Sequence, residues 1–140
     1  MRFECPIRVE FNHCDPAGIV FYPRYFEMIN ATVERFFAQL GWSFGKIHLE
    51  MGCGVPLVKI GAEFLAPSRL SDDLVFSLSF SRIGGASAQG VIRARSGQEV
   101  RMKADLTMVW TQPGLQARHW PEALKALMLG YVEAGDGVAA

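Results

Sequence analysis

The chain has 140 residues, half of them hydrophobic, and its 14 basic residues balance its 14 acidic residues. A formal net charge of zero and an isoelectric point near 6.8 argue against a nucleic-acid-binding protein, which usually shows a basic excess or stripe. The length fits one domain with its own hydrophobic core; we expect that domain to span residues 1–132, with a frayed tail at residues 133–140.

The first predicted element is a strand near the N-terminus. Ile7, Val9 and Phe11 alternate with charged residues, which is the period of a half-buried strand. Residues 12–18 are rich in turn-forming residues and separate this strand from the next element. We expect the strand to end where this turn segment begins.

The clearest helical pattern follows the turn segment. Pro23 suits the first turn of a helix, where its missing N–H leaves no hydrogen bond unmade, and Gly41 suits the end. A shorter helical segment is expected around residues 43–51. The apolar residues of the long helix recur at spacings of three and four and form one stripe, made of Phe26, Ile29, Val33, Phe36, Phe37 and Leu40.

Beyond residue 55 the hydrophobic period changes to two, which is typical of strands. In the first of these segments Val58, Ile60 and Phe64 alternate with charged residues or glycine. The links between the last three segments are short, so those strands run antiparallel. The expected strands cover residues 58–64, 74–81, 87–95 and 100–110.

These elements predict an α+β protein. A sheet with one buried face needs a cover, and the first helix is the only predicted element long and apolar enough to provide it. We therefore expect a curled antiparallel sheet of about five strands wrapped around a long central helix. A terminal helix is expected over residues 121–131, with Leu124, Leu127 and Met128 on one side.

Several kinds of site lack their usual sequence patterns. The three cysteines form no CxxC pair and the three histidines show no HxxxH or HExxH spacing, so we expect no metal site. No apolar run approaches the roughly 18 residues of a membrane span, and Glu4 and Pro6 stand where a signal peptide needs an apolar stretch. We expect a cytoplasmic protein without membrane or nucleic-acid partners.

The low share of charged residues bears on assembly. Charged residues make up 20% of the chain, against about 25% in typical soluble domains, and the mean hydropathy is +0.15. A buried interface needs fewer charges than a solvated surface. The composition therefore favours a homo-oligomer.

A short segment that leads into the long helix combines two features that acyl transfer requires. Pro16 holds Asp15 extended just before a turn, and Gly18 permits a positive φ there. The helix leaves its first N–H groups without internal partners, and its N-terminus carries a partial positive charge that stabilises an oxyanion. The candidate donors are the backbone N–H groups of Tyr22, Arg24 and Tyr25.

The same residues allow a plainer interpretation. An aspartate before a proline often hydrogen-bonds its own backbone and simply forms the turn. Aromatic residues at helical spacing, such as Tyr25, are commonly part of a core and not of a binding pocket. The residues alone leave the structural and the catalytic interpretations open.

The segment resembles the signature of the 4-hydroxybenzoyl-CoA thioesterase family of hotdog-fold proteins. The resemblance covers about residues 7–112 and includes the order of one helix followed by strands. The matching residues are Asp15-Pro16-Ala17-Gly18-Ile19-Val20-Phe21-Tyr22-Pro23 with Tyr25 beyond, and, more weakly, Gly54-Val55-Pro56-Leu57-Val58.

The resemblance implies a hotdog-fold enzyme that hydrolyses an aromatic or short-chain acyl-CoA as a homodimer or homotetramer, with the active site at the dimer interface. Asp15 matches the catalytic carboxylate, acting as nucleophile or as general base, and the backbone N–H of Tyr22 matches the group that polarises the thioester carbonyl. Gly18 and Tyr25 are the expected substrate-binding neighbours. No cofactor is implied, because coenzyme A is part of the substrate.

The chain departs from the family at the hairpin that carries a basic cluster for coenzyme A. Only Arg82 stands near that turn here, and it is the expected substrate-binding cation. A carrier-protein or lipid acyl thioesterase of the same fold, and a non-catalytic acyl-CoA-binding protein, remain alternatives. Other candidate phosphate contacts, which solvated strand faces explain equally well, are Arg93, Arg95, Arg101 and Lys103.

Overall fold

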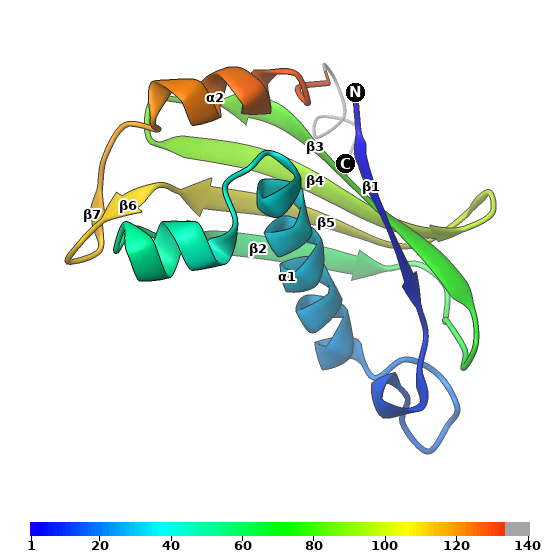
Figure 1. Cartoon of the computed structure of the whole chain (residues 1–140). Coiled ribbons are helices and arrows are strands. Elements are labelled where there is room, and N and C mark those ends of the chain that lie inside the picture. Colours follow the sequence, from blue (N-terminus) through cyan, green and yellow to red (C-terminus); the bar gives the residue numbers. More distant parts are fainter. Residues whose placement is uncertain (134–140) are drawn as a thin grey trace.

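The computed structural model describes residues 1–133, so residues 134–140 of the expected tail lie outside the described residues. Figure 1 shows a sheet that curls around one long helix. The elements in chain order are β1 (Phe3–Arg8), the short turn η1 (Phe11–His13), α1 (Tyr22–Gln39), η2 (Gly45–Glu50), β2 (Leu57–Phe64), β3 (Asp73–Ile83), β4 (Ser87–Ser96), β5 (Glu99–Val109), β6 (Thr111–Gln112), β7 (Gln116–Ala117) and α2 (Glu122–Leu129).

The main sheet has five strands in the order β1-β3-β4-β5-β2, and every neighbouring pair is antiparallel. This confirms the predicted α+β architecture, with about five antiparallel strands around a central helix. The alternation did not indicate the two-residue strands β6 and β7, which form a separate small ribbon. None of the helices within residues 1–133 has the length and apolarity needed to cross a membrane.

Helix α1 begins and ends where its sequence indicates. Pro23 lies in the first turn, and Gly41 adopts a left-handed φ of 86° just beyond the end. The Trp42 N–H donates to the Phe37 carbonyl at 2.9 Å, which satisfies a carbonyl that the helix leaves open. The buried face, however, includes Tyr25 and Met28, while Phe26 is 36% exposed. The prediction that Phe26 lies in the core stripe was wrong.

The core lies between α1 and the concave face of the sheet. On β3, Leu74, Phe76, Leu78 and Phe80 are all at most 1% exposed, as their alternation predicts. The N-terminal strand ends earlier than its pattern indicated, and Phe11 lies in η1 with 84% of its surface exposed. Turn formation over residues 11–13 therefore overrides the strand period at Phe11.

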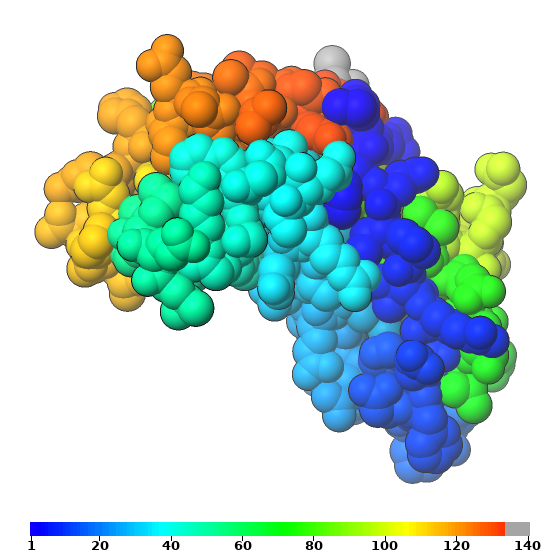
Figure 2. Space-filling view, in the orientation of Figure 1, coloured from blue at the N-terminus to red at the C-terminus, as the bar shows by residue number. Residues whose placement is uncertain are grey.

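The expected helical segment around residues 43–51 is present as η2, which winds more widely than an α-helix. Its hydrogen bonds span five residues, as in the Met51 N–H to Lys46 carbonyl bond of 3.0 Å. In Figure 2 η2 lies beside the C-terminal half of α1, whereas the N-terminal half of α1 and the segment before it project away from η2 and leave an open corner.

Strand β2 forms one edge of the sheet, and its apolar residues are not covered. Val58 is 61% exposed, Ile60 39% and Phe64 46%. Alternation along β2 predicted one buried face, but within a single chain neither face is closed. Strand β2 thus leaves apolar side chains and an unpaired sheet edge at the surface of the single chain.

The C-terminal helix α2 packs on β3 with Leu124 and Met128 buried, whereas Leu127 is 45% exposed. Only two of the three residues predicted for one side of this helix therefore reach the core. Glu133, expected in the frayed tail, is held in place. Its N–H donates to the Phe80 carbonyl at 2.8 Å, and its carboxylate accepts a 2.7 Å bond from Arg2.

Candidate active site

Asp15 lies in a tight turn between η1 and α1. One carboxylate oxygen, Oδ1, accepts a hydrogen bond from the Ala17 N–H at 2.9 Å, and the Gly18 N–H donates to the Asp15 carbonyl at 2.9 Å. Gly18 adopts a φ of 80°, as predicted for this turn. Among the contacts of residues 1–133, the second carboxylate oxygen, Oδ2, has no partner. Asp15 thus forms the turn with one oxygen and leaves the other without a partner among the described residues.

The first turn of α1, which follows the Asp15 turn in the chain, supplies one free backbone donor. Arg24, one of the three predicted donors, is occupied, because its N–H donates to the Phe21 carbonyl at 2.8 Å. Pro23 has no N–H to offer. Within the described chain, the N–H of Tyr22 has no acceptor, and it stands at the positive end of the helix. The predicted set of donors is therefore narrowed to Tyr22 as the clearest candidate.

Asp15 and Tyr22 line one cavity of about 530 Å³. Tyr25 and Phe64 give it aromatic walls, and residues 65–68 close one side. Three of the predicted site residues, Asp15, Tyr22 and Tyr25, are thus brought together. Gly18 instead lines a second hollow of about 420 Å³, which shares Asp15 as a wall and also includes Phe11 and Leu70.

Tyr25 contributes a buried hydroxyl to the wall of the cavity. Its side chain is 4% exposed, its ring packs against Phe64 with centroids 5.4 Å apart, and its hydroxyl donates to Ser68 Oγ at 2.9 Å. Burial raises the pKa of this phenol above its ordinary value, although the bond with Ser68 opposes the shift. Tyr25 is therefore a neutral hydrogen-bonding group at physiological pH.

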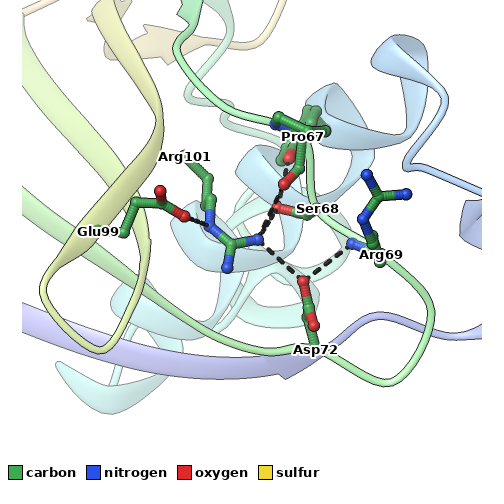
Figure 3. A network of polar contacts seen from close by, with 7 residues as sticks. Pro67, Ser68, Arg69, Asp72, Glu99 and Arg101 are labelled. Carbon is green, nitrogen blue, oxygen red and sulfur yellow. Dashed lines mark hydrogen bonds and ion pairs between the residues drawn. The ribbon is translucent and has the colours of Figure 1, made fainter.

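Behind Ser68 lies a charged network (Figure 3). Arg101 Nη1 lies 2.9 Å from Asp72 Oδ2, 3.0 Å from the Pro67 carbonyl and 3.2 Å from Ser68 Oγ. The pKa of Asp72 is lowered, chiefly by the hydrogen bond from the Arg69 N–H and then by the bond from Arg101. The sequence offered Arg101 as a possible phosphate contact, but its guanidinium has internal partners and its side chain is 13% exposed.

Other predicted cations lie elsewhere. Arg82 stands near the end of β3, roughly 30 Å along the strand from its first residue, Asp73, at a rise of about 3.3 Å per residue. Arg95 pairs with Glu4 at 2.7 Å. The Nδ1 atom of His13 accepts the Glu10 N–H at 2.8 Å, so this ring nitrogen is occupied within the N-terminal turn. Within one chain, the structure does not bring Arg82 to the cavity.

Sequence reasoning placed Phe64 in a strand and not at the site, and it did not single out Pro67, Ser68 or Asp72. These three lie in residues 65–72, which connect β2 to β3 and have no periodic pattern. The isolated pairing of Ile19 with Arg69 and the 2.8 Å bond from the Val20 N–H to the Ser68 carbonyl join this loop to the Asp15 segment. Among residues 1–133, no group of three histidine, cysteine, aspartate or glutamate side chains is arranged to hold a metal ion.

Comparison with known proteins connects this geometry to a family. The model of the thioesterase superfamily matches residues 17–103. A 4-hydroxybenzoyl-CoA thioesterase from Pseudomonas sp. (strain CBS-3) is 30% identical over 105 residues, which cover 70% of this chain and 74% of that protein. The matched segments thus include α1 and most of the sheet.

Solved structures share the fold over almost the whole chain. The crystal structure of an aspartate-to-asparagine variant of 4-hydroxybenzoyl-CoA thioesterase, complexed with 4-hydroxybenzoyl-CoA, aligns with a TM-score of 0.82 and 25% identity over 91% of this chain and 98% of that one. A 1,4-dihydroxy-2-naphthoyl-CoA thioesterase from Synechocystis aligns with a TM-score of 0.83 and 17% identity over 92% and 96%. The chain belongs to the thioesterase superfamily and is a thioester hydrolase with the hotdog fold.

Proposed function

We propose that this enzyme hydrolyses an aromatic acyl-CoA to the free acid and coenzyme A, with Asp15 as the catalytic carboxylate. The observation that supports this most directly is the meeting of three features in one cavity. Asp15, which has an unpartnered carboxylate oxygen, Tyr22, which has an unpartnered N–H at a helix start, and aromatic residues all line the same space of about 530 Å³. A cavity of this size accommodates an aryl group together with the thioester.

The names of related proteins support the choice of acyl group. The Pseudomonas relative is named for 4-hydroxybenzoyl-CoA and the Synechocystis neighbour for 1,4-dihydroxy-2-naphthoyl-CoA, both of which are hydroxylated aromatic thioesters. Phe64, which is 46% exposed and packs on the buried ring of Tyr25, offers a ring surface against which an aryl group can pack. The shorter aliphatic acyl groups would leave much of this aromatic surface uncovered.

The chemistry follows from where negative charge develops. As an oxygen nucleophile attacks the carbonyl carbon, the carbonyl oxygen becomes an oxyanion, which the Tyr22 N–H and the helix dipole stabilise. The C–S bond then breaks and coenzyme A leaves as the thiolate. Asp15 Oδ2 either takes a proton from the attacking water or attacks first and is released by water; in both routes one water is consumed. A thiolate leaves without a strong acid, so this route needs no metal or separate cofactor.

We also propose that the active form is a homodimer joined along the free edge of β2. Unpaired backbone groups and the exposed side chains of Val58, Ile60 and Phe64 make this edge suitable for pairing with a second copy. Phe64 also lines the cavity, so the edge and the site are continuous. A dimer formed here buries apolar surface beside the thioester.

Antiparallel pairing of two β2 strands has a consequence for Arg82. The register places Phe64 of β2 at the same end of the sheet as the start of β3, and Leu57 at the end that carries Arg82. A two-fold axis between the edges reverses one sheet relative to the other. The end that carries Arg82 of the partner subunit then lies beside the Asp15 end, so Arg82 can serve a site across the interface.

A panel of thioesters tests the proposed reaction. Thiol release is followed for acetyl-, palmitoyl-, benzoyl-, 4-hydroxybenzoyl- and phenylacetyl-CoA and for an acyl-carrier-protein thioester, with wild type and Asp15→Asn side by side. We expect the highest kcat/KM on an aromatic CoA ester and a loss of at least ~100-fold in the variant, as for removal of an acid–base group. Asp73→Asn, an exposed carboxylate near the same end of the sheet, is the matched control.

Two results would contradict the proposal. Preferred turnover of the carrier-protein or palmitoyl ester would favour a lipid acyl thioesterase, and tight ligand binding without turnover would favour a binding protein.

The dimer is tested separately by light scattering after gel filtration. Val58→Asp with Ile60→Asp should yield monomers, whereas Leu115→Asp, on an exposed loop residue, should leave the assembly unchanged.

A further inference from the structure

Arg101 lies on β5 with its guanidinium enclosed by the loop of residues 65–72 (Figure 3). One nitrogen, Nη1, contacts the Asp72 carboxylate, the Pro67 carbonyl and the Ser68 hydroxyl at 2.9, 3.0 and 3.2 Å. On its other side, Nε forms an ion pair with Glu99. One side chain thus holds three points of the same loop.

The main chain of Arg101 holds the beginning of this loop as well. Its carbonyl accepts the N–H groups of Leu65 at 2.8 Å and Ala66 at 3.2 Å. These bonds do not depend on the arginine side chain. A substitution at residue 101 therefore removes the guanidinium contacts and leaves the loop attached to β5, which separates the role of the side chain from that of the strand.

The loop in turn holds the segment that carries Asp15. The Ser68 carbonyl accepts the Val20 N–H at 2.8 Å, and Ile19 pairs with Arg69 as an isolated bridge. The Ile19 carbonyl accepts the Asp15 N–H at 3.0 Å. A continuous series of hydrogen bonds therefore leads from the Arg101 guanidinium through Ser68 and residues 19–20 to Asp15.

Ser68 also connects Arg101 to the wall of the cavity. Its hydroxyl is fully buried and contacts both Arg101 Nη1 and the Tyr25 hydroxyl. Tyr25 and residues 65–68 line the cavity. The same arginine therefore reaches the catalytic turn through backbone bonds and the cavity wall through a side-chain bond.

We propose that Arg101 is a positioning residue, whose guanidinium fixes the loop of residues 65–72 and thereby sets the place of Asp15 and Tyr25 around the thioester. As a statement about catalysis, this rests on the proposed function. Arg101 does not touch the cavity and acts only through Ser68, Pro67 and Asp72.

The positive charge of the Arg101 guanidinium explains why an arginine suits the positioning of this loop. A largely enclosed guanidinium is costly unless it meets charged and polar partners, so the arrangement of the loop that brings Asp72, the Pro67 carbonyl and Ser68 Oγ together on Nη1 is favoured. An apolar side chain would fill the space without fixing the direction of the loop. Misplacement of a reacting group by about 1 Å costs on the order of 100-fold in rate.

Hydrogen exchange tests the positioning without any reference to activity. In Arg101→Met, amide exchange followed by mass spectrometry should become at least several-fold faster in residues 14–21 and 65–72 and stay unchanged in β3 and β4. Arg95→Met, which removes an arginine paired with Glu4 on the same sheet, is the matched control and should not affect either segment. Unchanged exchange in both segments of a folded Arg101→Met would overturn the proposal.

Kinetics test its consequence for catalysis. We expect kcat/KM of Arg101→Met to fall by about 10- to 100-fold, with Arg101→Lys closer to wild type because it keeps a cation facing Asp72. In a Tyr25→Phe background the loss should be smaller, since part of the network is already absent. A folded Arg101→Met with the kcat/KM of Arg95→Met would contradict the catalytic role.

The two tests also separate this inference from the proposed function. If wild type hydrolyses no thioester while exchange in residues 14–21 responds to Arg101→Met, the positioning stands and the proposed reaction fails. Where Arg101→Met does not fold, Asp72→Asn removes the charged partner and leaves the arginine in place. It should accelerate exchange in the same two segments, and unchanged exchange there would overturn the proposal.

Discussion

The two ends of the sheet are held together by different forces. At the end that carries Asp15, directional contacts join the loops: Arg101 with Asp72 at 2.9 Å, the Tyr25 hydroxyl with Ser68 at 2.9 Å, and backbone bonds between two loops. At the opposite end, near the β3–β4 hairpin, Trp110 packs its ring against two other tryptophans, with centroids 6.3 and 5.9 Å away.

This difference separates the contacts that place reactive polar groups from the contacts that stabilise the fold. Hydrogen bonds and ion pairs fix the direction of a group but contribute little net stability, because water offers similar bonds to the unfolded chain. Buried aromatic rings contribute stability through the area they remove from water but fix polar atoms less strictly. We therefore expect changes near Asp15 to alter activity with a small loss of stability, and changes near Trp110 to do the reverse.

The largest effect on stability is expected at Trp110, which is 1% exposed. Trp110→Ala should lower the free energy of unfolding by about 3–5 kcal/mol, because it removes a large buried ring and leaves a cavity. Urea unfolding measures this loss. Leu115→Ala, at an 81% exposed residue of the same end, should change it by less than about 0.5 kcal/mol. A loss below about 1 kcal/mol for Trp110→Ala would contradict the expectation that aromatic packing near Trp110 stabilises the fold.

A smaller effect on stability is expected at Tyr25. Tyr25→Phe keeps the ring packed on Phe64 and removes the hydroxyl that meets Ser68, so unfolding should become easier by about 1–1.5 kcal/mol. The fall in kcat/KM should exceed what this loss of stability explains at temperatures where the variant is fully folded. Chemical denaturation and thiol release on the same sample give both numbers. An unchanged kcat/KM would remove Tyr25 from the site.

Replacing Gly18 tests whether a side chain at this position strains the turn that carries Asp15. Its φ of 80° disfavours a side chain, although the space around a built Cβ is open, so Gly18→Ala should cost about 1 kcal/mol through backbone strain alone. Gly45→Ala is the control, because its built Cβ meets only Ser43 Oγ at 3.8 Å and its φ is not left-handed. Equal unfolding free energies for the two variants would show that the turn carries no strain.

The smallest expected effects are changes of stability with pH, and their direction follows from the pKa shifts. The pKa of Asp72 lies below its ordinary value of 3.8 in the folded chain, so its contribution is complete above that value and is lost as the pH falls through the folded pKa. Thermal melts from pH 6 to pH 2 should show this loss, and Asp72→Asn should flatten it. Glu133, whose pKa is lowered by Arg2, should add a similar part that Glu133→Gln removes.

Tyr25 gives the opposite dependence at alkaline pH. Because burial raises its pKa above the ordinary 10.0, the unfolded chain loses the proton first, and stability should fall as the pH rises above 10. Tyr25→Phe should remove this part of the alkaline limb, which melting curves between pH 9 and pH 11 measure. An alkaline limb identical in the two proteins would contradict the burial of the phenol.

Much of the fold could be predicted because periodicity reports local structure well. The alternation at Leu74, Phe76 and Phe80 and the limits set by Pro23 and Gly41 all agree with the structure. The exact face of α1 that is buried could not be predicted from the sequence. Phe26 and Tyr25 are both large and aromatic, and only the place of the sheet decides which of them turns inward.

The site could be predicted where it is local and not where it depends on distant contacts. Asp15, Gly18 and Tyr22 lie within eight residues of each other, so the turn and the helix start are visible in the sequence. Arg101 alternates with apolar residues on β5 and therefore resembles a solvated strand charge. The loop that encloses it has no periodic pattern, and its contact with Arg101 joins residues more than 25 positions apart.

The central claim is that Asp15 acts on the thioester and is not needed for the fold. Asn at residue 15 can still accept the Ala17 N–H, so the turn should survive the substitution. The most direct measurement compares, in wild type and Asp15→Asn, hydrolysis of the preferred thioester with binding of its non-hydrolysable thioether analogue. We predict a fall in kcat of at least ~100-fold with an analogue Kd within about twofold of wild type. Near-normal turnover by the folded variant would contradict the claim.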